Sequence, residues 1–265
     1  MSEAIAPTTT SIRPIADKDR FGRQLERRDG VDFPYYNGVP VTIGVWQWVA
    51  VWAACLAGLL ALMFIPTPGN ILALIPRFLF LAIPLAVLIL VAGRYWKAIF
   101  RKVTGWDVLN MFFFWGLNFV VTSLAGVIVK AFFPVAGNAA ANTLGKDGVP
   151  DAIAFYIGTG IQLVGEEVFT ILPFLALMYF FFAKAKFSRK TAIILAWLIS
   201  AVWFGAAHLP TYDWNVAQAF IIIGVARLVL TLAFIRTKNL WVSSGAHILN
   251  DWSTFTFVLV SNLAH

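Results

Sequence analysis

Three acidic residues and two histidines stand inside long apolar stretches of the sequence. The carboxylates are Glu166, Glu167 and Asp251, and the imidazoles are His208 and His247. A carboxylate near the centre of a bilayer costs at least about 2.5–3.5 kcal/mol, so such groups usually line a polar cavity or pair with another group. Carboxylates and imidazoles serve as general acids and bases, and they also bind zinc with an open position for water. These five residues are therefore the candidate site.

Their spacing suits a hydrolytic reaction. Adjacent residues lie about 100° apart on a helix, so Glu166 and Glu167 share one side without pointing at the same spot. One glutamate can therefore act while the other supports it. His247 and Asp251 are four residues apart and stack on one helix face, as a ligand and its orienting partner would. Water activated by a metal ion or by a carboxylate of this set could attack a carbonyl group.

Other interpretations of the same residues remain open. The two glutamates could form a structural ion pair or an ion-translocation site. His208 could cap a helix end. Arg227 also lies in an apolar stretch and could be the counter-ion of a buried carboxylate. Arg77 and Lys130 lie close enough to the ends of their stretches to extend their charges to the membrane surface, and they are given no function.

The composition indicates a membrane protein. The chain has 265 residues, of which 60% are hydrophobic and 12% charged, against about 45–50% and about 25% in soluble domains. The mean hydropathy is +0.80. A spanning helix needs about 20 mostly apolar residues. The sequence thus predicts a polar tail over residues 1–40 and, over residues 41–265, an all-α polytopic transmembrane bundle of about seven helices, with six to eight as the range. The predicted spans are 42–65, 71–93, 107–133, 152–182, 191–209, 215–235 and 240–262.

The basic residues predict how the chain is oriented. They cluster in the first 40 residues and on alternate connections between the spans, which predicts a cytoplasmic N-terminus and a place in the plasma membrane, with lipids as partners. The net charge of +7 does not indicate nucleic acid, because the basic residues do not follow one polar face. The single cysteine, Cys55, excludes an intramolecular disulfide.

Three short motifs resemble those of a known family. Glu166-Glu167 is followed by Val-Phe-Thr, Phe204 precedes His208 by four residues, and His247 precedes Asp251 by four. In this order they resemble the motifs EExxxR, FxxxH and HxxxN or HxxxD of the CAAX protease and bacteriocin-processing (CPBP, or Abi) family. The resemblance covers about residues 150–262.

The resemblance implies an intramembrane endopeptidase, related to the type II CAAX prenyl endopeptidases, that acts on a membrane-associated protein or peptide. Glu166 would activate the hydrolytic water, with Glu167 supporting it. His208 and His247 would bind a metal ion or position the water, and Asp251 would orient the site or stabilise the oxyanion. The motifs leave open whether a metal takes part. We expect a divalent ion, zinc by the type of its ligands, bound by His208, His247 and Glu166.

One position departs from the family pattern. Where the first motif has arginine, the chain has Ile171. Arg227 could supply the missing charge from another helix, or the two glutamates could share a proton. Catalysis could also have been lost, which would leave a non-proteolytic immunity or scaffold protein of the same fold. A transporter would be expected to show inverted repeats, and the sequence has none.

The predicted spans also pose a geometric problem. If all spans end at two common planes, Glu166 lies about 20 Å from the outer start of its span, His208 lies near the outer plane and His247 lies nearer the inner one. Residues at three depths cannot share one water molecule. The sequence therefore predicts either that the helices tilt and begin elsewhere, with Gly158 and Gly160 interrupting the fourth span, or that the span boundaries are misplaced. We expect the boundaries to be at fault.

Overall fold

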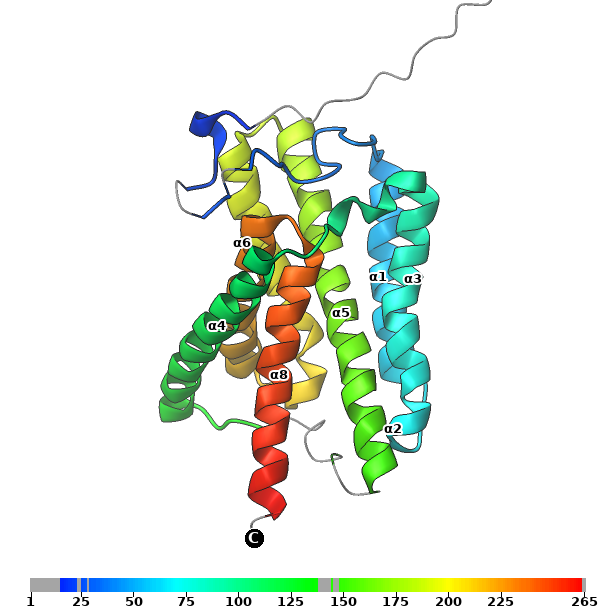
Figure 1. The fold of residues 1–265 in the computed structure, drawn as a ribbon, viewed down its shortest axis with the longest axis vertical. Helices are drawn as coiled ribbons and strands as arrows, with labels where there is room; N and C mark the ends of the chain where they lie inside the picture. The colour runs from blue at the N-terminus through cyan, green and yellow to red at the C-terminus, as the bar shows by residue number, and fades with distance from the viewer. Residues whose placement is uncertain (1–14, 23–24, 28, 138–143, 145–147, 264–265) are drawn as a thin grey trace, which may run out of the picture.

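The computed structural model describes residues 15–22, 25–27, 29–137, 144 and 148–263. In this part of the chain there are no strands, and seven long helices form one bundle (Figure 1). They are α1 (Val45–Phe64), α3 (Leu74–Ala92), α4 (Gly105–Phe132), α5 (Val149–Tyr179), α6 (Arg189–Ala207), α7 (Gly224–Thr237) and α8 (Leu240–Leu263). The short α2 (Gly69–Leu72) precedes α3, and π-helical turns extend α5 to Lys184 and begin α7 at Gln218. The predicted all-α fold is confirmed, and the helices match the predicted spans to within a few residues.

Six helical segments are long and apolar enough to cross a membrane, and they include every long helix except α8. The chain is thus an integral, multi-pass membrane protein. The polar side chains of α8, among them Ser243, Ser244, His247 and Asp251, lower its apolar content. These polar groups belong to the candidate site or contact other helices, which is why α8 is less apolar than the other long helices.

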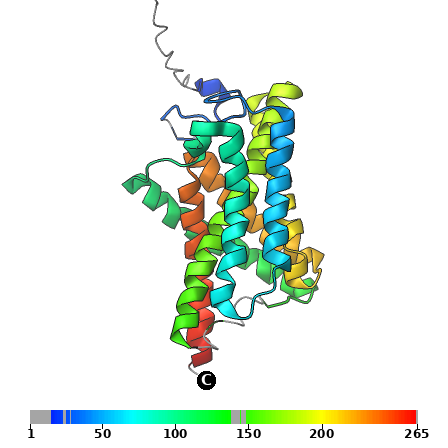
Figure 2. The ribbon, with the colours of Figure 1, turned by 90° about the vertical axis from the view of Figure 1, so that its right-hand side faces the viewer.

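The central helix of the bundle is α5. In α5, 83% of the most apolar stretch is buried, whereas in the other five membrane-spanning segments the buried share of the corresponding stretch is between 22% and 56%. Small residues let its neighbours approach closely, as is common in membrane bundles. A Cβ atom at Gly165 would lie 2.9 Å from the ring of Phe80 on α3, and one at Gly58 on α1 would lie 2.9 Å from the carbonyl oxygen of Phe80. In both views α4 crosses the bundle obliquely (Figures 1 and 2).

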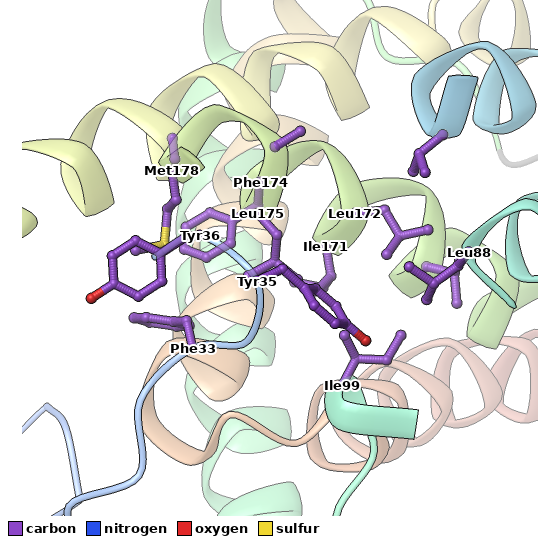
Figure 3. Close-up of a cluster of buried hydrophobic side chains, with 14 of the residues drawn as sticks. Phe33, Tyr35, Tyr36, Leu88, Ile99, Ile171, Leu172, Phe174, Leu175 and Met178 are labelled. Carbon is purple, nitrogen blue, oxygen red and sulfur yellow. The ribbon is translucent and has the colours of Figure 1, made fainter. Parts of the chain in front are cut away.

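The N-terminal segment, by which we mean the described part of residues 15–44, lies across one end of the bundle (Figures 1 and 2). Its residues Phe33, Tyr35 and Tyr36 are almost completely buried and belong to the main apolar core (Figure 3). The ring centroid of Phe33 lies 5.6 Å from that of Phe174 on α5. The last part of the predicted polar tail therefore packs as part of the helical domain.

A buried ion cluster fixes this segment to the bundle. The carboxylate of Glu26 accepts hydrogen bonds from Arg189 at the start of α6, at 2.7 and 2.9 Å, and from the Lys238 ammonium group between α7 and α8. Arg189 also donates to Asp32 at 2.7 Å. Because the Glu26 side chain is fully buried, these bonds carry charge in an apolar surrounding. The cluster joins the N-terminal segment, α6 and the corner between α7 and α8.

That corner lies well inside the bundle. Thr237, Lys238, Asn239 and Leu240 are all buried, and the corner sits below the ends of α5 and α6 in both views (Figures 1 and 2). Arg101 covers it, donating to the Thr237 carbonyl oxygen through its guanidinium group and to the Asn239 side chain through its backbone N–H. The connections that carry the basic clusters thus meet at one end of the bundle, as the charge pattern predicts.

The Glu26 cluster yields a testable prediction. Glu26→Gln removes the negative partner of two buried cations, and breaking a buried ion pair in this way costs about 3–5 kcal/mol. Desolvation alone would raise the pKa of Glu26, but the hydrogen bonds and charges of Arg189 and Lys238 lower it to about 2. Since this lies below the unfolded value of about 4.3, the stabilisation is complete above about pH 5 and disappears as the pH falls toward 2.

Thermal unfolding in detergent measures this effect. The gap in melting temperature between the wild type and Glu26→Gln should be widest near pH 7 and should narrow below about pH 5. Asp29→Asn, at a partly exposed carboxylate of the same segment, serves as a control with an expected effect of about 0–1 kcal/mol. A gap that stays constant with pH would contradict the prediction.

Candidate functional site

A cavity of about 410 Å³ lies between α4, α5, α7, α8 and the end of α6. Four of the five predicted site residues line it, namely Glu166, His208, His247 and Asp251. The fifth, Glu167, is completely buried behind the cavity wall, where its carboxylate meets His247. The structure therefore brings all five residues together.

The level of the helix ends explains how this happens. α5 runs without a break through Gly158 and Gly160, so the predicted interruption does not occur. The connection between α5 and α6 gives both helices a common starting level. From there Glu166 lies about 27 Å along α5 from Lys184, and His208 lies about 28 Å along α6 from its first residue. The two residues reach the same depth because α6 ends part-way along the longer α5.

His247 reaches that depth by a different route. It lies only about 10 Å along α8, but α8 begins at the buried corner and not at the end of the bundle. The expectation that the span boundaries are misplaced is wrong, because the helices match them to within a few residues. The mistaken assumption is that all helices end at two common planes.

A fully buried ion pair lies at the centre of the site. Arg227 on α7 donates two parallel hydrogen bonds to Glu167, at 2.6 and 2.9 Å, and neither side chain is exposed. The predicted role of Arg227 as counter-ion is confirmed. Ile171, which stands where the family has arginine, is completely buried in the apolar core near Tyr35 (Figure 3).

The ion pair also orients His247. The Nδ1 atom of His247 lies 2.9 Å from Oε1 of Glu167. Because a carboxylate paired with a guanidinium group can only accept, Nδ1 carries a proton and donates it. The other ring nitrogen, Nε2, is left to face the cavity, as in the carboxylate–histidine pairs that orient functional imidazoles in enzymes.

The Nε2 atom of His247 lies near two carboxylates that line the cavity. His247 Nε2 lies 3.8 Å from Oε2 of Glu166 and 3.9 Å from Oδ1 of Asp251. The other Glu166 oxygen, Oε1, accepts a hydrogen bond from Gln162 at 2.9 Å. Separations of 3.8 and 3.9 Å are too long for direct hydrogen bonds, so Nε2 of His247 is not bonded to either carboxylate.

His208 lines the same cavity from the end of α6. Its Nδ1 atom lies 2.9 Å from the carbonyl oxygen of Phe204 one turn earlier, so Nδ1–H donates and Nε2 faces the cavity. A second cavity, of about 240 Å³, shares His208 and Glu166 with the first and extends toward α1 and α3. The two cavities also share Gln162, Phe204 and Thr211. Toward α1 and α3 the second cavity is lined by apolar side chains, namely Leu59, Leu62, Met63, Phe80, Phe169 and Ala207.

Polar residues that were not predicted as site residues also line the cavity, among them Gln162, Tyr212 and Asn118. Gln162 precedes Glu166 by four residues and so lies on the same helix face, a spacing that could have identified it. Tyr212 lies in the connection after α6, where its ring stacks near His208 at a centroid distance of 6.4 Å. Asn118 lies on α4, far from every motif, and no pattern in the sequence marks it.

The donor atoms have the chemistry of a zinc site, but their arrangement does not match one. Among the described residues no three His, Cys, Asp or Glu side chains are grouped so as to hold a metal ion. The zinc ion expected from the sequence therefore stays a prediction.

A comparison with known proteins adds the family. Residues 149–253 match the family model described as type II CAAX prenyl endopeptidase Rce1-like. The match covers less than half of the chain and makes this segment similar to the CAAX proteases, so we call it the CAAX protease segment. No curated protein and no solved structure is detectably similar to the chain. The CAAX protease segment contains α5, α6, α7 and the first half of α8, and it includes all five predicted site residues together with Arg227.

The Arg227–Glu167 pair of this CAAX protease segment can be tested by a double-mutant cycle. Arg227→Gln leaves the Glu167 carboxylate buried without its guanidinium partner, which should cost about 3–5 kcal/mol of stability. Arg227→Lys keeps the charge but not the two parallel bonds, so its loss should be intermediate. Thermal unfolding in detergent measures both variants.

Combining Arg227→Gln with Glu167→Gln completes the cycle. The destabilisation of the double variant should be smaller than the sum of the destabilisations of the two single variants, because the double variant leaves no unpaired charge of this pair buried. Strict additivity would mean that the pair contributes nothing to the fold.

Proposed function

We propose that the chain is an intramembrane endopeptidase that hydrolyses a peptide bond of a membrane-associated protein or peptide, with Glu166 as the general base. The observation that carries this proposal is the arrangement of Glu166 Oε2 and His247 Nε2, 3.8 Å apart on the wall of a polar cavity, within a segment of a protease family.

Glu166 has the surroundings of a base. Gln162 holds one of its oxygens, so the second is free to accept a proton from a water molecule placed between Glu166 and His247. The water oxygen then forms a bond to the scissile carbonyl carbon, and its proton passes to Glu166. When the C–N bond breaks, protonated Glu166 returns that proton to the amine leaving group.

Glu167 and Arg227 act as positioning residues. Glu167 fixes the ring of His247 through Nδ1, and Arg227 fixes Glu167 through two parallel bonds. His247 thereby presents Nε2 toward the water with little freedom to rotate, which lowers the entropic cost of reaching the reactive geometry.

The remaining two residues take different roles. A developing oxyanion needs hydrogen-bond donors. His208 in its imidazolium form can donate through Nε2, so we assign it to the oxyanion. Asp251 can donate only when its carboxyl group is protonated, and its Oδ1 atom lies 3.9 Å from His247 Nε2. We assign Asp251 to orienting His247 and the water.

The second cavity suggests what kind of substrate is accepted. Its apolar wall begins directly beside Glu166 and His208, so an apolar group next to the scissile bond would be buried there. Processing of a CAAX-type or bacteriocin-type peptide fits this preference. From the basic connections we also propose that the end of the bundle that carries the N-terminal segment faces the cytoplasm, with the plasma membrane as the expected location.

A non-proteolytic immunity or scaffold role is the alternative raised by Ile171. The charge missing at that position comes from Arg227, so the departure from the family motif does not argue for lost catalysis.

Glu166→Gln tests the proposal directly. The amide cannot accept the proton of water, so we expect peptide cleavage to fall by about 10²- to 10⁴-fold while the melting temperature changes little. Cleavage is measured with a library of quenched-fluorescent peptides in detergent micelles. Asp213→Asn removes an exposed carboxylate in the connection after α6 and serves as the control with full activity. Equal cleavage by Glu166→Gln and wild type would contradict the proposal.

Elemental analysis tests the zinc prediction. If zinc is bound by His208, His247 and Glu166, the purified protein should hold about one zinc ion per chain. His208→Ala and His247→Ala should then lose the metal, whereas Asp213→Asn should keep it. A metal-free protein whose cleavage activity survives strong chelators would show that Glu166 acts without an ion.

A further inference from the structure

Asn118 on α4 is a completely buried amide without a partner. Its side chain has no exposed surface, and neither Oδ1 nor Nδ2 makes a hydrogen bond within the described part of the chain. An unpaired buried polar group costs about 1–3 kcal/mol, and most such groups in native proteins are satisfied. A polar group kept at this cost suggests a partner that arrives from outside.

Asn118 lines the same 410 Å³ cavity as Glu166, His208 and His247. The position one turn earlier on α4 is Phe114, which packs in an apolar cluster with residues of α7 and α8. The position one turn later is Thr122, whose hydroxyl group donates back to the Asn118 carbonyl oxygen at 2.7 Å. Trp115, three residues before Asn118, also has a buried N–H without a partner among the described residues, but it does not line the cavity, whereas Asn118 does.

The chemistry of an amide narrows what it can bind. Asn118 offers one acceptor oxygen and one donor nitrogen side by side, which matches the N–H and C=O groups of a peptide backbone. The nearby polar groups are less suited to a peptide group. Ionised Glu166 and Asp251 offer only acceptor atoms, and the Asn250 amide already donates to Asp251 at 3.0 Å. A neutral peptide group is thus the partner that fits Asn118.

We propose that Asn118 binds the backbone of the substrate peptide in the cavity. This rests on the proposed peptidase function and extends it to α4, which lies outside the family segment of residues 149–253. The bonds form when the peptide enters and persist through the reaction. Asn118 should therefore govern KM more than kcat, because binding that is equal in ground and transition states lowers KM alone.

Asn118→Leu is the test variant, since leucine has a similar size and no hydrogen-bonding group. KM for a cleaved peptide should rise about 5-fold to 100-fold, as expected for two lost neutral hydrogen bonds, with kcat nearly unchanged. The melting temperature should stay equal or increase, because a buried unpaired amide is removed.

Asn110→Leu is the matched control on the same helix. The Asn110 amide is fully paired: it donates to the Trp106 carbonyl oxygen at 2.6 Å and accepts from Arg236 at 2.7 Å. This variant should show the opposite pattern, with a lower melting temperature and an unchanged KM. If Asn118→Leu behaves like Asn110→Leu, Asn118 is structural and the proposal is overturned.

A binding experiment separates this proposal from the proposed function. The same peptides, labelled with a fluorophore, are titrated by anisotropy onto Glu166→Gln and onto Glu166→Gln with Asn118→Leu. Weaker binding by the double variant supports the role of Asn118, even if the wild type cleaves none of the peptides and the peptidase proposal fails. Equal binding by both variants, or binding by neither, overturns it.

Discussion

The buried ion pair between Glu167 and Arg227 is the interaction on which the site depends. Two charges without solvent contact are stable in an apolar interior only when their hydrogen-bonding capacity is used, and here a guanidinium group spans both oxygens of a carboxylate. The same carboxylate receives Nδ1–H of His247. One interaction therefore joins α5, α7 and α8 and determines where His247 directs its second nitrogen. The orientation of the His247 ring in turn determines the distance from its Nε2 atom to Glu166.

The origin of the arginine shows that charge balance is a property of the folded site and not of one motif. In the family pattern the cation follows the glutamates on the same helix, whereas here it comes from α7. Position 171 is thereby released from a polar role, and Ile171 is buried in the apolar core. The arginine from α7 supplies the positive charge that Ile171 does not provide.

The sequence was sufficient for features that depend on local composition. Apolar length located all seven helices, and the cost of burying charge singled out Glu166, Glu167 and Asp251. The relative depth of these residues could not be predicted, because it depends on a corner between α7 and α8 that is buried under the N-terminal segment. That segment looked like a tail, since its few buried aromatic residues are outnumbered by polar ones. Asn118 could not be identified either, because only the folded structure shows that its amide has no partner.

The proposed hydrolysis inside a membrane needs water and the peptide at the same point. The two cavities share Glu166 and His208, and the second extends from them along apolar side chains toward α1 and α3. Water held on the polar side experiences a low dielectric, in which the charges of Glu166 and of the ion pair act more strongly than they would in bulk water. In the proposed reaction, the apolar side chains toward α1 and α3 would cover an apolar group of the substrate. A reaction that needs both phases is therefore confined to the boundary where the carboxylate and the imidazole stand.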